Sequence, residues 1–312
     1  MSDPRTRGIV LIVNPRSTRY DRATIAALRA ACEAFGETRM VDTAGLDHAL
    51  SAAHEARERG AGVVAVAGGD GTVAEMAGIL AASPTSLLPI PAGSTNVFAR
   101  ALGWPAATRD VAPLLAGALA APRRTLRLGS LSMDGGPDRT FCVNAGVGID
   151  AATVDWIEAH PAAKRRFRQL AFALAAAGPG LAAFLRRDGL EIAVDGTPGV
   201  RAATFMAACG HPYAYVGSRP LELMPHVEWD GALEWLAMTR ALPLTAGAHV
   251  LRAVMNRGLE AGRALMGGVT RGEIVVTTRR PVHVQADGEA LGTASRVCLT
   301  PGPPLDVVVP PR

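Results

Sequence analysis

A loop with three glycines around one acid holds the residues most able to do chemistry. Residues 68–72 read Gly-Gly-Asp-Gly-Thr, after an apolar run and before a helical pattern over 73–82. Glycines let backbone N–H groups approach a bulky anion, and the helix that follows adds the positive end of its dipole. Because a loop that only holds phosphate has no need of Asp70, the pattern favours phosphoryl transfer from a nucleotide. The alternative is a tight turn in which Asp70 caps the helix.

Two other polar segments are candidates for the same phosphate site. The loop Pro91–Asn96 follows another apolar run, where Ser94 or Thr95 would either cap a helix or form a second wall for phosphate. After the first apolar run, Arg16 and Arg19 are either a solvated pair of charges or ligands for phosphate oxygens. The planar guanidinium suits the second role.

Two segments beyond residue 140 are ambiguous. Asp287-Gly288-Glu289 is either a hairpin turn or a pair of acids, of which one takes the proton from an attacking hydroxyl and the other orients it. Residues 144–151 have the form of a dinucleotide fingerprint, but no βαβ unit surrounds them. We therefore interpret them as a close backbone approach at a domain junction.

The composition excludes several classes of protein. Lys164 is the only lysine among 32 basic residues, so the chain has neither the Gly-Lys pair of a Walker P-loop nor the strand lysine of a protein kinase. The four cysteines and seven histidines show no metal-binding spacing. A net charge of +4 suits an anionic nucleotide or a negatively charged membrane surface, and no basic block of the density expected for nucleic acid is present.

The pattern of elements that must position these residues changes near residue 125. Residues 8–130 alternate strand and helix patterns, which predicts a mostly parallel sheet covered by helices. Asn14, Thr43, Asp70 and Gly93 each follow an expected strand. Because ligands bind past the carboxyl ends of parallel strands, we expect these four residues to converge on one edge of the sheet.

Beyond residue 125, short strand-like runs separated by turn signals predict an antiparallel β-sandwich. Helical insertions are expected near 162–187 and 243–266, and the apolar stretch 167–185 suits either a core helix or a helix lying on an anionic membrane. The expected strands are Thr125–Ser132, Thr140–Val143, Leu190–Val194, Ala203–Ala208, Leu233–Met238, Glu273–Thr278, Val282–Gln285, Val297–Leu299 and Leu305–Val309.

In their order along the chain, the motifs resemble the diacylglycerol kinase catalytic-domain family, the bacterial soluble lipid kinases related to sphingosine kinases and, more distantly, NAD kinases. The resemblance implies an α/β plus β protein, with a three-layer α/β ATP-binding domain over 1–128, to which a tail of about 301–312 returns, and a β-sandwich acceptor domain with helical insertions over 129–300. The matching segments are Asn14-Pro15-Arg16-Ser17, Thr43, Gly68–Thr72, Pro91–Asn96, Asn144–Ala151, Asp230–Leu233 and Asp287–Glu289.

The resemblance also implies an ATP-dependent lipid kinase of phospholipid metabolism, which uses Mg²⁺ and transfers the γ-phosphoryl group to a hydroxyl of a diacylglycerol-like lipid. Asp287 would be the general base beside Glu289, Asp70 would be a further catalytic group, and Asp230 would hold a structural Mg²⁺. The residues around ATP would be Asn14, Arg16, Arg19, Thr43, Gly68, Gly69, Gly71, Thr72, Gly93, Ser94, Thr95 and Asn96.

Two positions depart from the family pattern. Val97 and Arg127 stand where the family commonly carries acids of its magnesium-linked network. A nucleotide- or lipid-binding protein with weakened catalysis therefore stays an alternative. So does a soluble nucleotide kinase of the NAD kinase type, because the loop 68–72 is common to both groups.

The sequence also indicates where the protein acts. The N-terminus lacks the apolar core of a signal peptide, and no run of about 18 apolar residues suits a transmembrane helix. We expect a cytoplasmic protein whose partners are ATP and a lipid, with no nucleic acid. Peripheral contact with the inner face of the membrane and a homodimer stay open.

Overall fold

The computed structural model describes residues 8–17, 20–159, 189–239 and 265–311. It divides into two compact units: unit 1 comprises Met1–Arg127 and Pro303–Arg312, and unit 2 comprises Leu128–Gly302. The assignment of ATP binding to 1–128 and of the acceptor to 129–300 stays a prediction. The insertion expected near 162–187 lies outside the described residues, and with it the choice between a core and a membrane-surface helix for 167–185.

Unit 1 is built on a parallel sheet. Its hydrogen-bonded order is β2 (Thr38–Asp42), β1 (Ile9–Val13), β3 (Val63–Gly68) and β4 (Ser86–Pro91), and the end of β16 (Glu289–Val307) pairs with β4. Every residue of β3 and β4 is buried. Uninterrupted burial of this kind is typical of a parallel strand that is covered on both faces, and it explains the apolar runs in the sequence.

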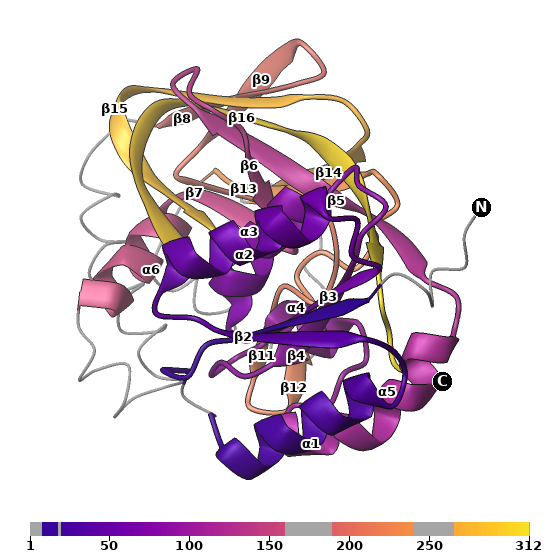
Figure 1. Ribbon diagram of the computed structural model, residues 1–312. Coiled ribbons are helices and arrows are strands. Elements are labelled where there is room, and N and C mark those ends of the chain that lie inside the picture. The colour runs from indigo at the N-terminus through magenta and orange to yellow at the C-terminus, as the bar shows by residue number, and fades with distance from the viewer. Residues whose placement is uncertain (1–7, 18–19, 160–188, 240–264, 312) are drawn as a thin grey trace. The chain divides into compact units, whose positions relative to one another are not determined.

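Helices cover both faces of this sheet. α1 (Arg22–Glu33) and α5 (Ala112–Ala120) pack together on one face, and α2 (Leu46–Glu58) and α3 (Asp70–Leu80) pack together on the other (Figure 1). The short helix α4 (Val97–Ala101) follows β4. The mixed α/β architecture that the sequence predicts is thus present, with helix, sheet and helix as three layers of unit 1.

The bounds of α1 follow from its sequence. Asp21 precedes the helix, and its carboxylate accepts a hydrogen bond from the Thr24 amide at 2.9 Å. Such a cap satisfies one of the amides that a helix start leaves without an intrahelical partner. Ile25, Leu28 and Cys32 recur at helical spacing and are buried.

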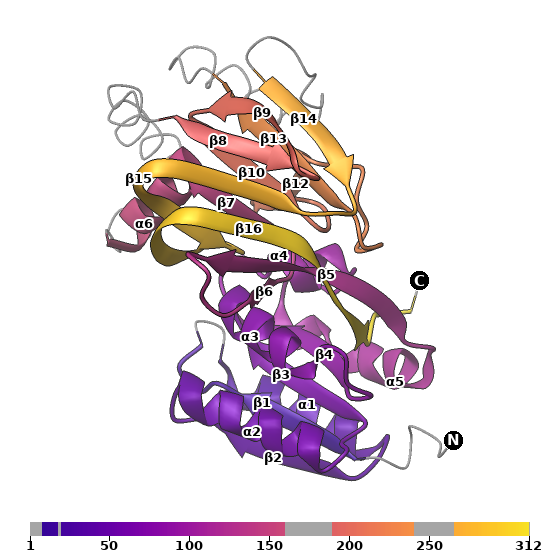
Figure 2. The ribbon, with the colours of Figure 1, turned by 90° about the horizontal axis from the view of Figure 1, so that it is seen from above.

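Unit 2 consists mainly of antiparallel strands. Figure 2 shows β8, β15 and β16 as neighbours, and pairing extends from β15 through β7, β10 and β13 to β14. A single helix of the described part, α6 (Ile149–Ala159), follows β7. The strands are β5 (Arg124–Met133), β6 (Arg139–Phe141), β7 (Asn144–Gly148), β8 (Leu190–Val194), β9 (Thr197–Ala202), β10 (Thr204–Ala208), β11 (Ala214–Val216), β12 (Arg219–Leu221), β13 (Leu233–Met238), β14 (Leu265–Thr270), β15 (Ile274–Ala286) and β16.

The strands of unit 2 differ from the expected sandwich in two respects. All of them except β11 and β12, which form a separate two-stranded sheet, belong to one branched hydrogen-bonded network, because the first part of β15 pairs with β8 and its last part pairs with β7. The runs 273–278 and 282–285 belong to this one strand, whose register shifts between Thr277 and Val282. Likewise, the runs expected at 297–299 and 305–309 belong to the single strand β16, which ends at Val307.

The helical insertion expected near 243–266 is described only at its end. There Leu265 and Met266 begin strand β14, so the helix does not extend to residue 266. The rest of that insertion lies outside the described residues. Among the described helices, none is both long enough and apolar enough to cross a membrane.

Candidate active site

The two glycine-rich loops lie against each other at the carboxyl ends of β3 and β4. These strands are parallel neighbours, with Gly68 opposite Pro91. A Cβ atom placed on Gly93 would lie 2.6 Å from the Cα of Gly69, whereas one placed on Gly69 would lie 3.6 Å from the Cα of Gly93. Gly93 therefore permits a direct contact between the backbones of the two loops, and a side chain there would separate them.

Asn96 fixes the shape of the second loop. Its Oδ1 accepts a hydrogen bond from the Gly93 amide at 2.8 Å, and its Nδ2 donates one to the Gly93 carbonyl at 2.9 Å. The side chain is buried, and the backbone adopts the left-handed conformation with φ 51°. Asparagine tolerates this conformation better than most residues. The predicted nucleotide ligand Asn96 thus uses its side-chain amide to hold the loop.

Asp70 connects the two loops through its carboxylate. Its Oδ2 accepts a hydrogen bond from the Thr95 hydroxyl at 3.0 Å, and its Oδ1 accepts one from the Phe98 amide at 3.3 Å. Burial raises the pKa of the Asp70 carboxyl, while the Thr95 hydroxyl and the amides of residues 96–98 oppose the rise. The alternative in which Asp70 caps its own helix is wrong, because Gly69 precedes α3 without a side-chain cap and Asp70 binds the start of α4 instead.

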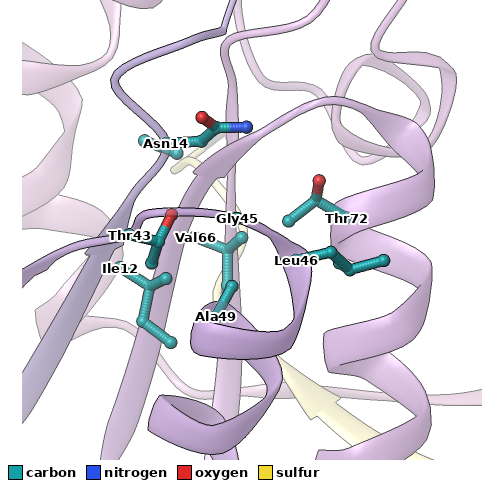
Figure 3. A pocket seen from close by; sticks show the side chains of 9 residues that line it. Ile12, Asn14, Thr43, Gly45, Leu46, Ala49, Val66 and Thr72 are labelled. Atoms are coloured by element: carbon teal, nitrogen blue, oxygen red, sulfur yellow. The ribbon is translucent and has the colours of Figure 1, made fainter.

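A small pocket lies beside the first loop, and three of the predicted nucleotide residues line it. Asn14, Thr43 and Thr72 follow β1, β2 and β3, and Figure 3 shows their polar groups at the same end of the pocket. The volume of about 40 Å³ accommodates a small part of a ligand and not a whole nucleotide. The other lining residues are Ile12, Gly45, Leu46, Ala49, Val66 and Ala67, none of which we predicted from the sequence as a site residue.

Some of these polar groups also hold unit 1 together. The Thr43 hydroxyl donates a hydrogen bond to the Val13 carbonyl at 3.2 Å, and the Asn14 Oδ1 accepts one from the Arg16 amide at 2.9 Å. The side chains of Arg16, Ser94 and Thr95 are exposed, as phosphate ligands must be before binding. Arg19 lies outside the described residues.

Asp287 belongs to unit 2 and lies in a hairpin turn. Asp287 and Gly288 both have positive φ, at 49° and 80°, and Ala286 pairs with Glu289 across the turn. These features define a two-residue turn of the kind that favours Asp-Gly. The hairpin interpretation is therefore right for the backbone. Glu289 starts β16 and its side chain is exposed.

The Asp287 carboxylate is bound by backbone amides of another segment. Its Oδ2 accepts a hydrogen bond from the Cys142 amide at 2.6 Å, and its Oδ1 accepts from the amides of Val143 at 2.8 Å and Asn144 at 3.1 Å. These bonds hold the carboxylate in one orientation. A carboxylate offers about four positions for accepted hydrogen bonds, so the three amides occupy most of its capacity.

Asp230 is paired with an arginine. Its Oδ2 accepts a hydrogen bond from the Arg271 guanidinium at 2.5 Å, and its Oδ1 accepts one from the Ala232 amide at 3.2 Å. Burial alone would raise the pKa of Asp230, but the bonds from Arg271 and Ala232 outweigh it and lower the pKa. Across the part of the chain that the structure describes, no three acidic, histidine or cysteine side chains are grouped to hold a metal ion. The donors present do not fit a protein-held Mg²⁺ at Asp230.

Unit 2 also contains a polar cluster that the sequence did not single out as a site, in which Asn144 and Gln285 are buried and Asp150 and Tyr213 are half-buried. Asn144, Asp150, Tyr213 and Gln285 are joined by hydrogen bonds. Asn144 and Asp150 belong to the motif 144–151, which could have drawn attention to them. The close backbone approach that we inferred for residues 144–151 is present, since a Cβ atom on Gly148 would lie 2.9 Å from the carbonyl oxygen of Ala203. The segment forms strand β7 and the start of α6 within unit 2, and the chain passes between the units elsewhere.

Comparison with known proteins supports the expected family and fold. Residues 8–130 match the family model described as the diacylglycerol kinase catalytic domain. A crystal structure from Bacillus anthracis str. Sterne, provisionally described as a diacylglycerol kinase, has a TM-score of 0.71 at 20% identity and covers 98% of each chain. A second structure, of a diacylglycerol kinase from the same organism, has a TM-score of 0.69 at 19% identity and covers 98% of this chain and 97% of its own.

These structural likenesses establish the fold alone, because their sequence identities are low. The comparison with curated proteins gave no match. The resemblance to the diacylglycerol kinase catalytic-domain family that the motifs predict is confirmed over residues 8–130.

Proposed function

We propose that this protein is an ATP-dependent lipid kinase that phosphorylates a hydroxyl of a diacylglycerol-like lipid. The observation that carries the proposal is the meeting of Asn14, Thr43 and Thr72 around one pocket beside the glycine-rich loop. That loop leads into α3, a helix of 11 residues whose first amides have no intrahelical partner. Glycine amides and a helix start together suit a triphosphate.

The proposed reaction exchanges one phosphorus–oxygen bond for another. The lipid hydroxyl oxygen forms a bond to the γ-phosphorus, the bond from that phosphorus to the β–γ bridging oxygen breaks, and ADP leaves. The hydroxyl proton passes to a carboxylate, for which Asp287 is our candidate, with Glu289 beside it in the turn. The three amide bonds to Asp287 fix where its carboxylate points. No step of this proposal runs through a protein-held metal ion.

A lipid-dependent ATPase assay with matched variants tests the proposal. We expect ADP release that depends on vesicles containing diacylglycerol, and a loss of on the order of a hundredfold in Asp70→Asn, because one displaced loop misplaces the phosphates. Asp195→Asn is the matched control, since the Asp195 carboxylate also accepts a threonine hydroxyl, that of Thr270 at 2.7 Å. ADP release that does not depend on lipid, or that has the same rate in Asp70→Asn as in wild type, would contradict the proposal.

A nucleotide-binding protein with weakened catalysis is the second candidate. Both Asp70 and Asp287 accept backbone hydrogen bonds, Asp230 is paired with Arg271, and Val97 and Arg127 replace acids of the family pattern. Calorimetry with ATP separates the two candidates: binding without turnover on any lipid supports the second. Replacing the lipid by NAD in the same assay tests the nucleotide kinase alternative.

A further inference from the structure

We propose that Asn144, Asp150, Tyr213 and Gln285 form a positioning network that holds the Asp287 turn in its working orientation. The proposal rests on the lipid kinase function argued above and identifies residues that act on the reaction through Asp287. All the contacts that carry it lie within unit 2.

Gln285 connects the turn to the rest of the network. Its Oε1 accepts a hydrogen bond from the Gly288 amide at 2.9 Å, so it holds the turn residue next to Asp287. Its Nε2 lies 2.9 Å from Asp150 Oδ2 and 3.1 Å from Asn144 Oδ1. The side chain is only 1% exposed, which means that these partners, and not water, determine its orientation.

Asn144 connects the same turn from the opposite strand. Its backbone amide donates to the Asp287 carboxylate, and its carbonyl accepts from the Asp287 amide at 2.8 Å. Its side-chain Nδ2 donates to the Tyr213 carbonyl at 2.9 Å. A displacement of Asn144 would therefore move both the backbone and the carboxylate of Asp287.

Asp150 and Tyr213 close the network. The Tyr213 hydroxyl donates to Asp150 Oδ2 at 2.9 Å, the same oxygen that Gln285 binds. Burial raises the pKa of Asp150, and the bonds from Tyr213 and Gln285 oppose the rise. A carboxylate that is partly removed from water is costly unless it is well paired, and an apolar side chain in a half-buried position such as that of Asp150 avoids this cost. The arrangement thus favours a role in orientation over one in stability.

The surroundings leave space for these side chains. A Cβ atom on Gly146 would lie 2.0 Å from Asp150 Oδ2 and 2.8 Å from Gln285 Nε2, so the glycine of the motif makes room for the pair. The Tyr213 side chain also packs against an apolar cluster that includes Met206, Met224 and Leu236. Tyr213 is therefore held at both its ring and its hydroxyl.

Two variants of Asp150 separate positioning from other roles. Asp150→Leu removes the acceptor, and we expect kcat on diacylglycerol vesicles to fall on the order of a hundredfold, as a catalytic group displaced by about 1 Å does. The KM for ATP should stay within about twofold, because Asp150 does not bind nucleotide in this scheme. Asp150→Asn keeps an oxygen that accepts from Tyr213 and Gln285 and should restore most of kcat. Asp155→Leu, in the same helix, is the matched control.

Tyr213→Phe gives an independent test of the hydroxyl. It keeps the ring in the apolar cluster and should lower kcat with an unchanged KM for ATP, whereas the control Tyr215→Phe should not. Hydrogen exchange supplies a readout that needs no turnover: in Asp150→Leu, the amides of Cys142, Val143, Asn144 and Gly288 should lose protection before those of β10 and β13. These four amides bind Asp287 or Gln285.

The outcomes distinguish this proposal from the proposed function. If the wild type shows no lipid phosphorylation, the kinase proposal fails, and the exchange experiment alone decides whether the network holds the turn. If the wild type is active and Asp150→Leu keeps its kcat or its four amides stay protected, the network does not position Asp287. An inactive Asp150→Asn would also overturn the proposal, since it would show that the charge itself is needed.

Discussion

Asp70 is a single residue with two properties that oppose each other. Its carboxylate lies in the loop that we propose for phosphate, yet its hydrogen bonds to Thr95 and the Phe98 amide hold the neighbouring loop. Burial raises its pKa, so the folded protein disfavours the charge that these bonds stabilise. The residue therefore links the stability of unit 1 to pH.

The pH dependence of unfolding should reveal this link. Because the folded-state pKa lies above the ordinary value of 3.8, the folded protein retains a proton that the unfolded chain has released. The contribution of Asp70 to the free energy of unfolding is thus fully present below 3.8 and is lost as the pH rises through the folded-state pKa. Asp70→Asn does not titrate, so its stability relative to wild type should rise over that window.

Urea unfolding between about pH 4 and neutrality measures this difference, with Asp195→Asn as the matched variant. A stability of Asp70→Asn relative to wild type that is constant with pH, or that falls as the pH rises, would count against a raised pKa of Asp70 in the folded protein.

Cys298 should be far less reactive than its partial exposure suggests. Its Sγ donates a hydrogen bond to Glu273 Oε1 at 2.9 Å, and burial, followed by Glu273, raises its pKa to about 11. The thiolate is the reactive form, so alkylation near neutral pH should be slow in the folded protein. Glu273→Gln should accelerate it, which mass spectrometry after iodoacetamide treatment can measure. Cys32, with a pKa of about 11 and a fully buried side chain, is the internal control. Equal rates with and without Glu273 would refute this account.

At the scale of elements, the contact between the loops after β3 and β4 predicts that alanine destabilises the protein more at Gly93 than at Gly69. Gly93→Ala would place a Cβ 2.6 Å from the Cα of Gly69, so the loops must separate. Overpacking of this kind costs about 1–3 kcal/mol. Gly69→Ala, whose Cβ lies 3.6 Å from Gly93, should cost less than about 1 kcal/mol. Urea unfolding of the two variants compares them directly, and an equal loss in both would show that the loops are not packed as described.

The parallel elements could be predicted from sequence because their signals are local. The apolar runs of β3 and β4 and the spacing of Ile25, Leu28 and Cys32 each lie within one element. β7 was missed because its two glycines resemble a loop, whereas its strand form depends on pairing with β10 and β15. The continuity of β15 was hidden because Pro281 follows a polar stretch. β16 pairs with β15 up to Thr277 and again from Val282, so one partner strand spans the interruption.

The residues of the candidate site also divide into those with a local signal in the sequence and those brought together by distant contacts. Asn14 and Thr43 could be placed together, because each follows a strand of one parallel sheet, and both line the pocket. The three amides that bind Asp287 precede it in the chain by between 143 and 145 positions. Gln285 is separated from its partner Tyr213 by 72 positions. Contacts at such separations leave no spacing pattern in a single sequence.

At the scale of the whole molecule, the chain leaves unit 1 within β5 and returns to it at the end of β16. Val307 pairs with Leu87 of β4, and the Val308 amide donates to the Leu87 carbonyl at 2.9 Å. The Trp104 indole N–H donates to the Val308 carbonyl at 3.3 Å. The last residues therefore complete the sheet of unit 1.

Substitutions of two neighbouring valines test whether the last residues pack against the sheet of unit 1. Val308 is fully buried, so Val308→Ala should lower the free energy of unfolding by about 2 kcal/mol through lost burial and a small cavity. Val309→Ala is the matched control, because Val309 is only half-buried. Chemical denaturation of both variants gives the comparison. If the two substitutions have the same effect, the tail does not pack into unit 1 as described.

In the proposed reaction, the protein moves the terminal phosphoryl group of ATP to a lipid hydroxyl. The most direct measurement incubates the protein with ATP labelled in the γ-phosphate and vesicles containing diacylglycerol, and then separates lipid from water. We predict label in the lipid phase as a phosphomonoester, dependent on the protein and reduced in Asp70→Asn. Label that stays entirely in the aqueous phase, with ATP bound but intact or with the phosphate transferred to NAD or water, would contradict the account.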